Sequence, residues 1–188
     1  MVQFQNHRYK LRNNNYNKFE SQEDYLKLKQ FVASKTQGKF ILMNQNEYSK
    51  YLDRHVRSDK LLGSQQINTS SDIAKCRKLV DSICGSHFNN YIKRLLLLMT
   101  SEAATNIVKH AYYGNLTVVK STGYLRLIFK DHGPGILYEY IPIILFCWGT
   151  TLDDSLGAGL ILIYNYADRS LLYTTNNGTT LIIEKRWR

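Results

Sequence analysis

Apolar and polar positions alternate along the chain with two different periods, and each change of period marks a new element. From residue 61 onward the pattern predicts a strand, two helices, two strands, a helix and two strands, in that order. Period two with β-branched and aromatic residues is typical of strands, whereas apolar residues three and four apart are typical of helices. The predicted strands are 61–68, 116–120, 124–130, 171–175 and 180–186, and the predicted helices are 70–84, 90–113 and 160–168.

Short turns join several of the predicted strands, which indicates an antiparallel sheet. Residues 121–123 separate two strands, and Asn176-Asn177-Gly178 separates the last two with a sequence typical of hairpin turns. An antiparallel sheet needs helices on only one of its faces. We therefore expect an α+β protein, a two-layer α/β sandwich whose mostly antiparallel sheet carries helices on one face and leaves the other free for a partner.

The first 60 residues follow a different pattern and are expected to form an appended unit. After a polar stretch of about 20 residues come a helix that begins at a capping sequence, 21–24, a short strand at 40–43 and a second helix at 46–57. None of these elements carries a recognisable chemical motif. We therefore predict an N-terminal extension of unknown function, 1–60, and a functional domain, 61–188.

Composition and charge narrow the classes of function. The chain of 188 residues is 44% hydrophobic, and its longest apolar runs, 95–99 and 141–148, are far too short to span a bilayer. Because its start lacks the apolar core of a signal peptide, we expect a soluble cytoplasmic protein with no membrane partner. The net charge of +10 suits an acidic protein surface or nucleic acid. Nucleic acid is the less favoured partner, since long basic runs and base-stacking motifs are missing from the sequence.

The long central helix carries the first candidate chemistry. Glu102, Asn106 and His110 follow one another at intervals of four residues, so they stack on one face of the helix. Polar side chains on such an apolar helix are costly to bury unless a partner satisfies them, and a metal-bound phosphate chain would do so. The carboxylate would orient a nucleophile, and the amide oxygen would reach Mg²⁺. The alternative is a solvated stripe on an amphipathic helix.

Three later segments contain glycines and could converge on the same nucleotide. Asp131 ends a predicted strand and precedes two glycines, which let the chain turn sharply beside whatever the carboxylate binds, such as the exocyclic amine of adenine. Gly157 and Gly159 open a helix, whose first N–H groups suit phosphates. Thr179 adds a hydroxyl after Gly178. Each segment alone is a weak signal, because most such sequences are ordinary turns; their order along the chain is specific.

In this order the segments resemble the sequence boxes of the Bergerat-fold (GHKL) ATPases. Residues 101–110, Ser-Glu-Ala-Ala-Thr-Asn-Ile-Val-Lys-His, resemble the N box, and residues 131–136, Asp-His-Gly-Pro-Gly-Ile, resemble the first glycine box. Residues 157–160, Gly-Ala-Gly-Leu, resemble the second glycine box, and Gly178-Thr179 resembles the last. Within the superfamily, these motifs are most similar to bacterial anti-sigma-factor serine/threonine kinases of the stress-response switch. The resemblance covers about residues 64–188.

The resemblance implies a role for each matching residue. Glu102 would be the base that orients the attacking hydroxyl, Asn106 would hold Mg²⁺ on the phosphates, and Asp131 would bind the adenine amine. The other implied nucleotide contacts are Gly133, Gly135 and Ile136 of the first glycine box, Gly157, Ala158, Gly159 and Leu160 around the phosphates, Thr179 at adenine, and Lys109 and His110 at the end of the N box, where a packing or helix-surface role is equally open.

The implied function is ATP-dependent phosphorylation of serine or threonine in a STAS-type antagonist, with ATP and Mg²⁺ as cofactors. Further partner candidates are a sigma factor, a phosphatase and a second copy of the chain. The alternative is an ATP-binding anti-sigma or stress regulator that sequesters its partner without catalysis, although the intact Glu102 favours catalysis. The bulky stretch 138–148 departs from the family's usual lid. A histidine-kinase catalytic domain is less favoured, because His55 and His87 lack the flanking pattern of a phosphoacceptor.

Overall fold

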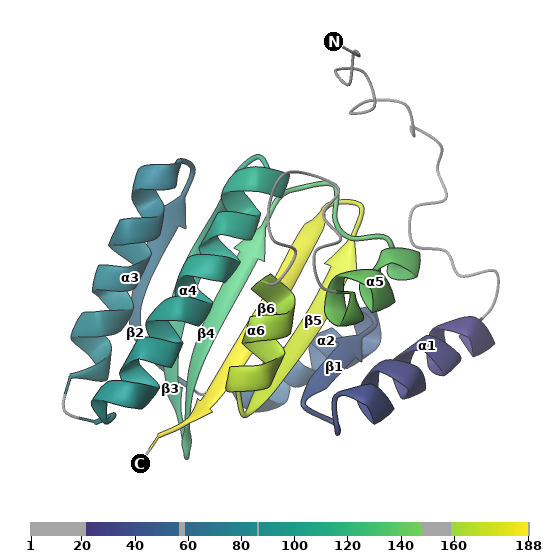
Figure 1. The fold of residues 1–188 in the computed structure, drawn as a ribbon, viewed down its shortest axis with the longest axis horizontal. Helices are drawn as coiled ribbons and strands as arrows, with labels where there is room; N and C mark the ends of the chain where they lie inside the picture. Colours follow the sequence, from purple (N-terminus) through teal and green to yellow (C-terminus); the bar gives the residue numbers. More distant parts are fainter. Residues whose placement is uncertain (1–21, 57–58, 86, 148–158, 188) are drawn as a thin grey trace, which may run out of the picture.

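The computed structural model describes residues 22–56, 59–85, 87–147 and 159–187. Within these residues, six strands form one sheet in the order β1-β5-β6-β4-β3-β2 (Figure 1). The strands are β1 (Phe40–Met43), β2 (Lys60–Ile67), β3 (Gly114–Ser121), β4 (Tyr124–Asp131), β5 (Arg169–Thr175) and β6 (Gly178–Arg186). Every predicted strand is present, and no bound differs from the prediction by more than two residues.

The pairing of the strands confirms an α+β protein with a mostly antiparallel sheet. β2 pairs with β3, β3 with β4, β4 with β6 and β5 with β6, all antiparallel. The exception is β1, which lies parallel to β5 at the edge of the sheet. The sheet is therefore mixed, because a strand from the N-terminal 60 residues joins it.

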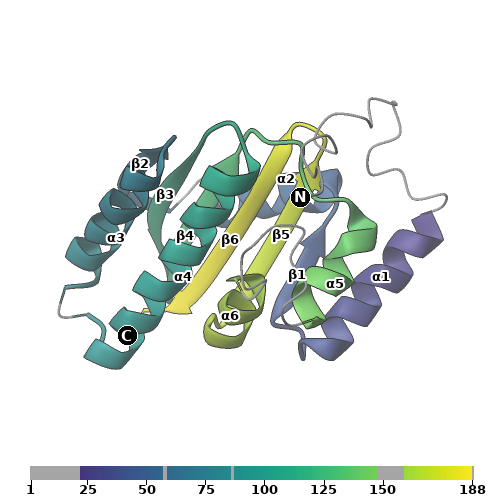
Figure 2. The same cartoon turned by 45° about the horizontal axis from the view of Figure 1, so that its top comes forward.

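Helices cover one face of this sheet along its whole width. Figures 1 and 2 show α1, α3, α4, α5 and α6 on that face, with α4 across its middle. The helices are α1 (Gln22–Lys35), α2 (Gln45–Tyr51), α3 (Ser70–Cys84), α4 (Asn90–His110), α5 (Ile141–Phe146) and α6 (Gly159–Tyr166), with a π-helical turn at Leu52–Val56 and a 3₁₀ turn at Tyr138–Tyr140. None of the helices in the described ranges combines the length and apolar character needed to cross a membrane.

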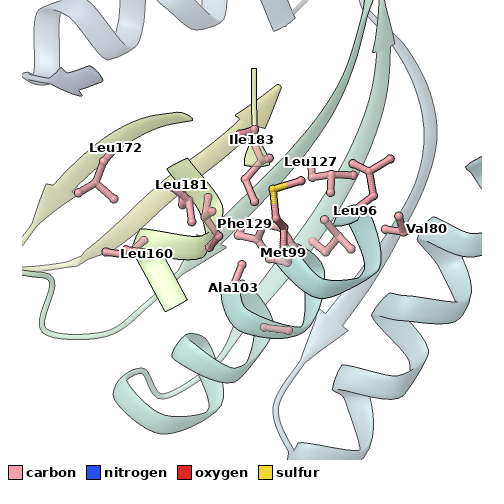
Figure 3. Packing of buried hydrophobic residues seen from close by; sticks show 14 of the residues in the cluster. Val80, Leu96, Met99, Ala103, Leu127, Phe129, Leu160, Leu172, Leu181 and Ile183 are labelled. Atoms are coloured by element: carbon pink, nitrogen blue, oxygen red, sulfur yellow. The ribbon is translucent and has the colours of Figure 1, made fainter. Parts of the chain in front are cut away.

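The main core lies between the sheet and these helices, and strand alternation fills it. Leu127 and Phe129 of β4 point to the helical face, where they meet Leu96, Met99 and Ala103 of α4 (Figure 3). These α4 residues recur at intervals of three and four, so one stripe of the helix is buried. All five are at most 2% exposed, which leaves the neighbouring stripe of α4 for polar residues.

The second face of the sheet is not entirely free, contrary to the expectation from the sequence. α2 and the π-helical turn pack on it through Tyr48, Tyr51 and Val56, which contact a smaller apolar cluster that includes Met43 and Ile182. The sequence did not predict that α2 covers part of this face, because polar residues separate the apolar residues of the second face along the strands. Helices therefore cover one face of the sheet fully and the other in part.

Residues 22–56 also contribute to the main core. Val32 of α1 and both Phe40 and Leu42 of β1 are at most 1% exposed and belong to the same cluster as the residues of α4. The boundary predicted at residue 60 thus does not coincide with a break in packing, since the sheet and its core continue across it. A short strand at a sheet edge gives no sequence signal of its distant partner, here β5.

Candidate functional site

The central helix presents its polar stripe to the first residue of α6. A Cβ atom placed on Gly159 would lie 2.9 Å from Glu102 Oε2 and 3.7 Å from both Asn106 side-chain amide atoms. Glu102 and Asn106 are both half-buried, because the adjacent stripe of α4 packs on the sheet. The structure therefore brings the two predicted N-box residues to the start of the helix that follows the second glycine segment.

Asp131 lies where β4 ends and is held by two backbone groups. Its Oδ1 accepts hydrogen bonds from the N–H of Gly133 at 2.9 Å and from the N–H of Thr179 at 3.0 Å. Burial raises the pKa of Asp131, while these two hydrogen bonds and the nearby His132 and His110 act to lower it. Among the described residues nothing donates to the second oxygen, Oδ2. That oxygen is consequently available to accept a hydrogen bond from a ligand amine.

The glycine loop after Asp131 is fixed against the hairpin of β5 and β6. Gly135 has φ +74°, and a Cβ there would lie 1.8 Å from the carbonyl oxygen of Thr175. The next N–H, that of Ile136, donates to Thr174 Oγ1 at 2.8 Å, and the Thr174 and Thr179 hydroxyl oxygens are 3.2 Å apart. Only glycine fits position 135, for both steric and conformational reasons.

The same loop also touches the end of α4. A Cβ on Gly133 would lie 2.9 Å from the Cα and Cβ of Ala111 and 2.9 Å from the carbonyl oxygen of His110. Because Asn106 lies one turn before His110 on the same helix, this contact sets the Asp131 loop beside the polar stripe. The Asp131 loop and the polar stripe of α4 therefore form one continuous surface.

The remaining predicted residues divide into three groups. His110 and Lys109 are exposed at the end of α4, and only His110 influences Asp131 electrostatically. Leu160 is 8% exposed and packs in the main core, so its side chain is structural. Gly157 and Ala158 lie outside the described residues, so the predicted phosphate loop is seen only from Gly159 onward.

The polar groups of this surface fit a magnesium nucleotide. No group of three His, Cys, Asp or Glu side chains that could hold a metal is found within the described ranges. Mg²⁺ commonly takes one or two protein ligands and completes its shell with phosphate oxygens and water, so Asn106 alone would suffice. The N-terminus of α6 next to Asn106 would supply a positive dipole end for the same phosphates.

Thr174 was missed by the sequence reasoning. Its hydroxyl accepts a hydrogen bond from Ile136 N and lies beside the Thr179 hydroxyl, so Thr174 connects the glycine loop after Asp131 to Thr179. The sequence shows only that Thr174 lies one residue before the Thr175–Gly178 turn. It gives no sign that the Thr174 hydroxyl contacts residue 136. Thr174 is 2% exposed, which is typical of a residue that positions a loop rather than one that contacts solvent.

A scan against models of known protein families and a search of curated proteins found no match for this chain.

Proposed function

We propose that this chain binds ATP with Mg²⁺ and transfers the γ-phosphoryl group to a serine or threonine of a regulatory protein, a STAS-type antagonist of a bacterial stress or sigma-factor switch. The observation that carries the proposal is the approach of Glu102 and Asn106 to Gly159, the first residue of α6. A carboxylate, an amide and a helix N-terminus are the groups that phosphoryl transfer requires for orientation and charge neutralisation.

Each group of the site has a defined task in this proposal. Asp131 accepts the adenine amine through Oδ2, because Oδ1 is already engaged by Gly133 and Thr179. Asn106 holds the metal ion, whose positive charge offsets that of the phosphates. Glu102 accepts a hydrogen bond from the attacking hydroxyl and receives its proton as the reaction proceeds.

A sequestering regulator is the second candidate, because the chain exposes apolar side chains that a protein partner could cover. Leu26 and Phe31 of α1 and Ile143 of α5 are 41 to 46% exposed. The Phe31 ring lies 5.7 Å from that of Phe146 of α5, so the two helices contact each other beside these exposed side chains. Such a surface suits a protein partner. It is compatible with a kinase as well, so only catalysis separates the two candidates.

The nucleotide assignment is tested by thermal denaturation. A ligand that binds only the folded chain raises its melting temperature by mass action, so Mg-ATP and Mg-ADP should do so. Mg-GTP should have a much smaller effect, because Asp131 would face a carbonyl where adenine offers an amine. Asp131→Asn should reduce the response to ATP. Equal shifts for ATP and GTP would contradict the adenine assignment.

The catalytic assignment is tested by measuring nucleotide affinity and phosphotransfer in the same variants. Glu102→Ala should bind ATP nearly normally and lose about 10²–10⁴-fold in transfer rate, the usual contribution of a general base. Asn106→Ala should weaken Mg-ATP binding itself. Glu23→Ala, on the exposed face of α1, serves as the control and should change neither nucleotide affinity nor transfer rate.

Candidate STAS-domain proteins are the acceptors in this experiment. Transfer at the wild-type rate by Glu102→Ala would exclude Glu102 as the base. Should wild type bind ATP and phosphorylate no candidate acceptor, the sequestering function takes the place of the kinase.

A further inference from the structure

A cavity of about 710 Å³ lies at the opposite end of β4 from Asp131, beside the turn between β3 and β4. Its volume is within the range of small-molecule sites. The side chains that line it include five cations, Arg54, Lys60, Lys120, Arg126 and Arg169, against two carboxylates, Asp59 and Glu184. The cavity is therefore electropositive, and the question is which of its charges are already neutralised.

Arg126 and both carboxylates neutralise one another at the base of the cavity. Arg126 Nε donates to Glu184 Oε1 at 2.7 Å, and its Nη1 contacts Asp59. Arg169 Nε lies 3.4 Å from Glu184 Oε2. Both carboxylates are thereby paired, which leaves Arg54, Lys60 and Lys120 without an ion pair among the described residues.

Lys60 and Lys120 are such cations, and their arrangement is unfavourable without a ligand. They are direct partners across the β2–β3 pair, so their side chains lie on the same face of the sheet. Like charges directly opposite each other destabilise a strand pair. Within the described part of the chain, neither lysine forms an ion pair. An anion between the two ammonium groups would remove the repulsion.

Trp187 holds one of these ammonium groups in place without neutralising it. Lys120 Nζ lies 4.4 Å from the centre of the Trp187 ring. The backbone N–H of Trp187 donates to Gly123 O at 2.9 Å, and the Trp187 ring packs edge-on against Phe88 with ring centres 5.4 Å apart. A cation over an aromatic face keeps its full charge for an anion.

An apolar compartment adjoins the two lysines. A second cavity of about 450 Å³ is lined by Lys60, Lys120 and Trp187 together with Leu62, Ile83 and His87, whose ring lies 4.6 Å from that of Trp187. Because Lys60, Lys120 and Trp187 line both cavities, they form the boundary between them. A ligand with its anion at this boundary would place any attached ring or chain against apolar side chains.

We propose that Lys60 and Lys120 form a second ligand site, which binds the phosphate group of a small organic phosphate whose apolar part enters the compartment of Leu62, Ile83 and Trp187. Two ammonium groups suit the charge of a phosphate monoester, and the compartment supplies the hydrophobic contribution. The site is separate from the proposed nucleotide site and does not depend on it.

Phenyl phosphate and inorganic phosphate are the probes, because they carry similar charge and differ by one ring. Calorimetric titration of the full chain should show tighter binding of phenyl phosphate. Lys60→Gln with Lys120→Gln should weaken that binding by about tenfold or more, as expected for losing charge-assisted contacts. Both probes binding equally would overturn the apolar assignment of the ligand.

The control is a second pair of charge-removing substitutions. Arg77→Gln with Lys78→Gln removes two exposed cations from α3 that do not line the cavity, and should leave the affinity unchanged. The same loss in both double variants would mean non-specific attraction to a basic protein and would overturn the site. Asp131→Asn, in the proposed nucleotide site, should also leave the affinity for phenyl phosphate unchanged; a loss in that variant would place the probe in the nucleotide site and overturn the proposal as well.

Discussion

Gly38 and Gly135 have the same positive φ angle in different surroundings. Both have φ +74°, a region that other residues rarely adopt. A Cβ on Gly38 would meet nothing within 4 Å, whereas a Cβ on Gly135 would lie 1.8 Å from the carbonyl oxygen of Thr175. The pair therefore separates the cost of the conformation from the cost of the close approach.

Alanine at these two positions should destabilise the chain to different extents. Gly38→Ala should lower the free energy of unfolding by about 1 kcal/mol, the cost of the left-handed conformation alone. Gly135→Ala should lower it by about 3–5 kcal/mol, because the loop must also leave Thr174 and Thr175. Urea denaturation measures both. Equal losses would show that the loop can move away from the β5–β6 hairpin without cost.

At the scale of elements, a buried ion pair attaches α2 and the π-helical turn to the sheet. Burial opposes the charge of Arg126, yet its hydrogen bonds to Glu184 and Asp59 raise the pKa of Arg126 overall. Tyr51 also donates to Glu184 Oε1, at 2.5 Å, and burial raises the pKa of Tyr51. Arg126 Nη1 donates in addition to the carbonyl oxygen of His55 at 2.6 Å. One arginine thus joins the turn, β4 and β6.

Removing this arginine should be much more damaging than removing an exposed ion-pair partner. Within the described residues, Arg126→Met leaves the buried carboxylate of Asp59 without a cation and that of Glu184 with Arg169 alone, which should lower the free energy of unfolding by about 3–5 kcal/mol. Lys27→Met breaks a pair with Glu23 whose side chains are 67% and 73% exposed. That substitution should change stability by less than about 0.5 kcal/mol. Chemical denaturation of both variants makes the comparison, and a small effect of Arg126→Met would mean that the turn is held by its apolar contacts.

These elements also show what the sequence could and could not predict. Every strand followed from local patterns, as did α4, whose first residues are capped by Asn89 through its hydrogen bond from Ile92 N at 2.9 Å. Such signals lie within a few residues of one another. The pairing of β1 with β5 and the packing of α2 on the second face join segments more than 100 residues apart. Nothing in the local pattern of 40–43 specifies that partner.

The candidate site likewise combines features that the sequence predicts with contacts that it does not. The stacking of Glu102 and Asn106 follows from helical spacing, and the sharp turn after Asp131 follows from its glycines. The contact of Gly133 with Ala111 and the hydrogen bond of Ile136 N to Thr174 depend on tertiary structure. Sequence reasoning therefore named most of the groups but not the contacts that hold them together.

At the scale of the whole molecule, the N-terminal segment supports the sheet that carries the candidate site. β1 pairs with β5 along its whole length, from Phe40 opposite Ser170 to Met43 opposite Tyr173. The next residues of β5, Thr174 and Thr175, hold the glycine loop. Tyr48 stacks on Tyr173 with ring centres 4.3 Å apart, which reinforces the same strand from the second face. Removing the segment should therefore affect nucleotide binding as well as folding.

Two truncations test this dependence. A chain that starts at residue 61 loses β1 and α1, exposes the edge of β5 and removes Val32, Phe40 and Leu42 from the core. Burying a large apolar side chain contributes about 1.5–3 kcal/mol, so losing these three removes about 4.5–9 kcal/mol, which is comparable with the whole unfolding free energy of a typical domain. We expect this chain to be insoluble or unable to bind ATP. A chain that starts at residue 22 keeps every described element and should fold and bind normally. Circular dichroism, melting temperature and ATP titration of both chains decide the outcome: a folded, ATP-binding chain from residue 61 would restore the boundary predicted from the sequence.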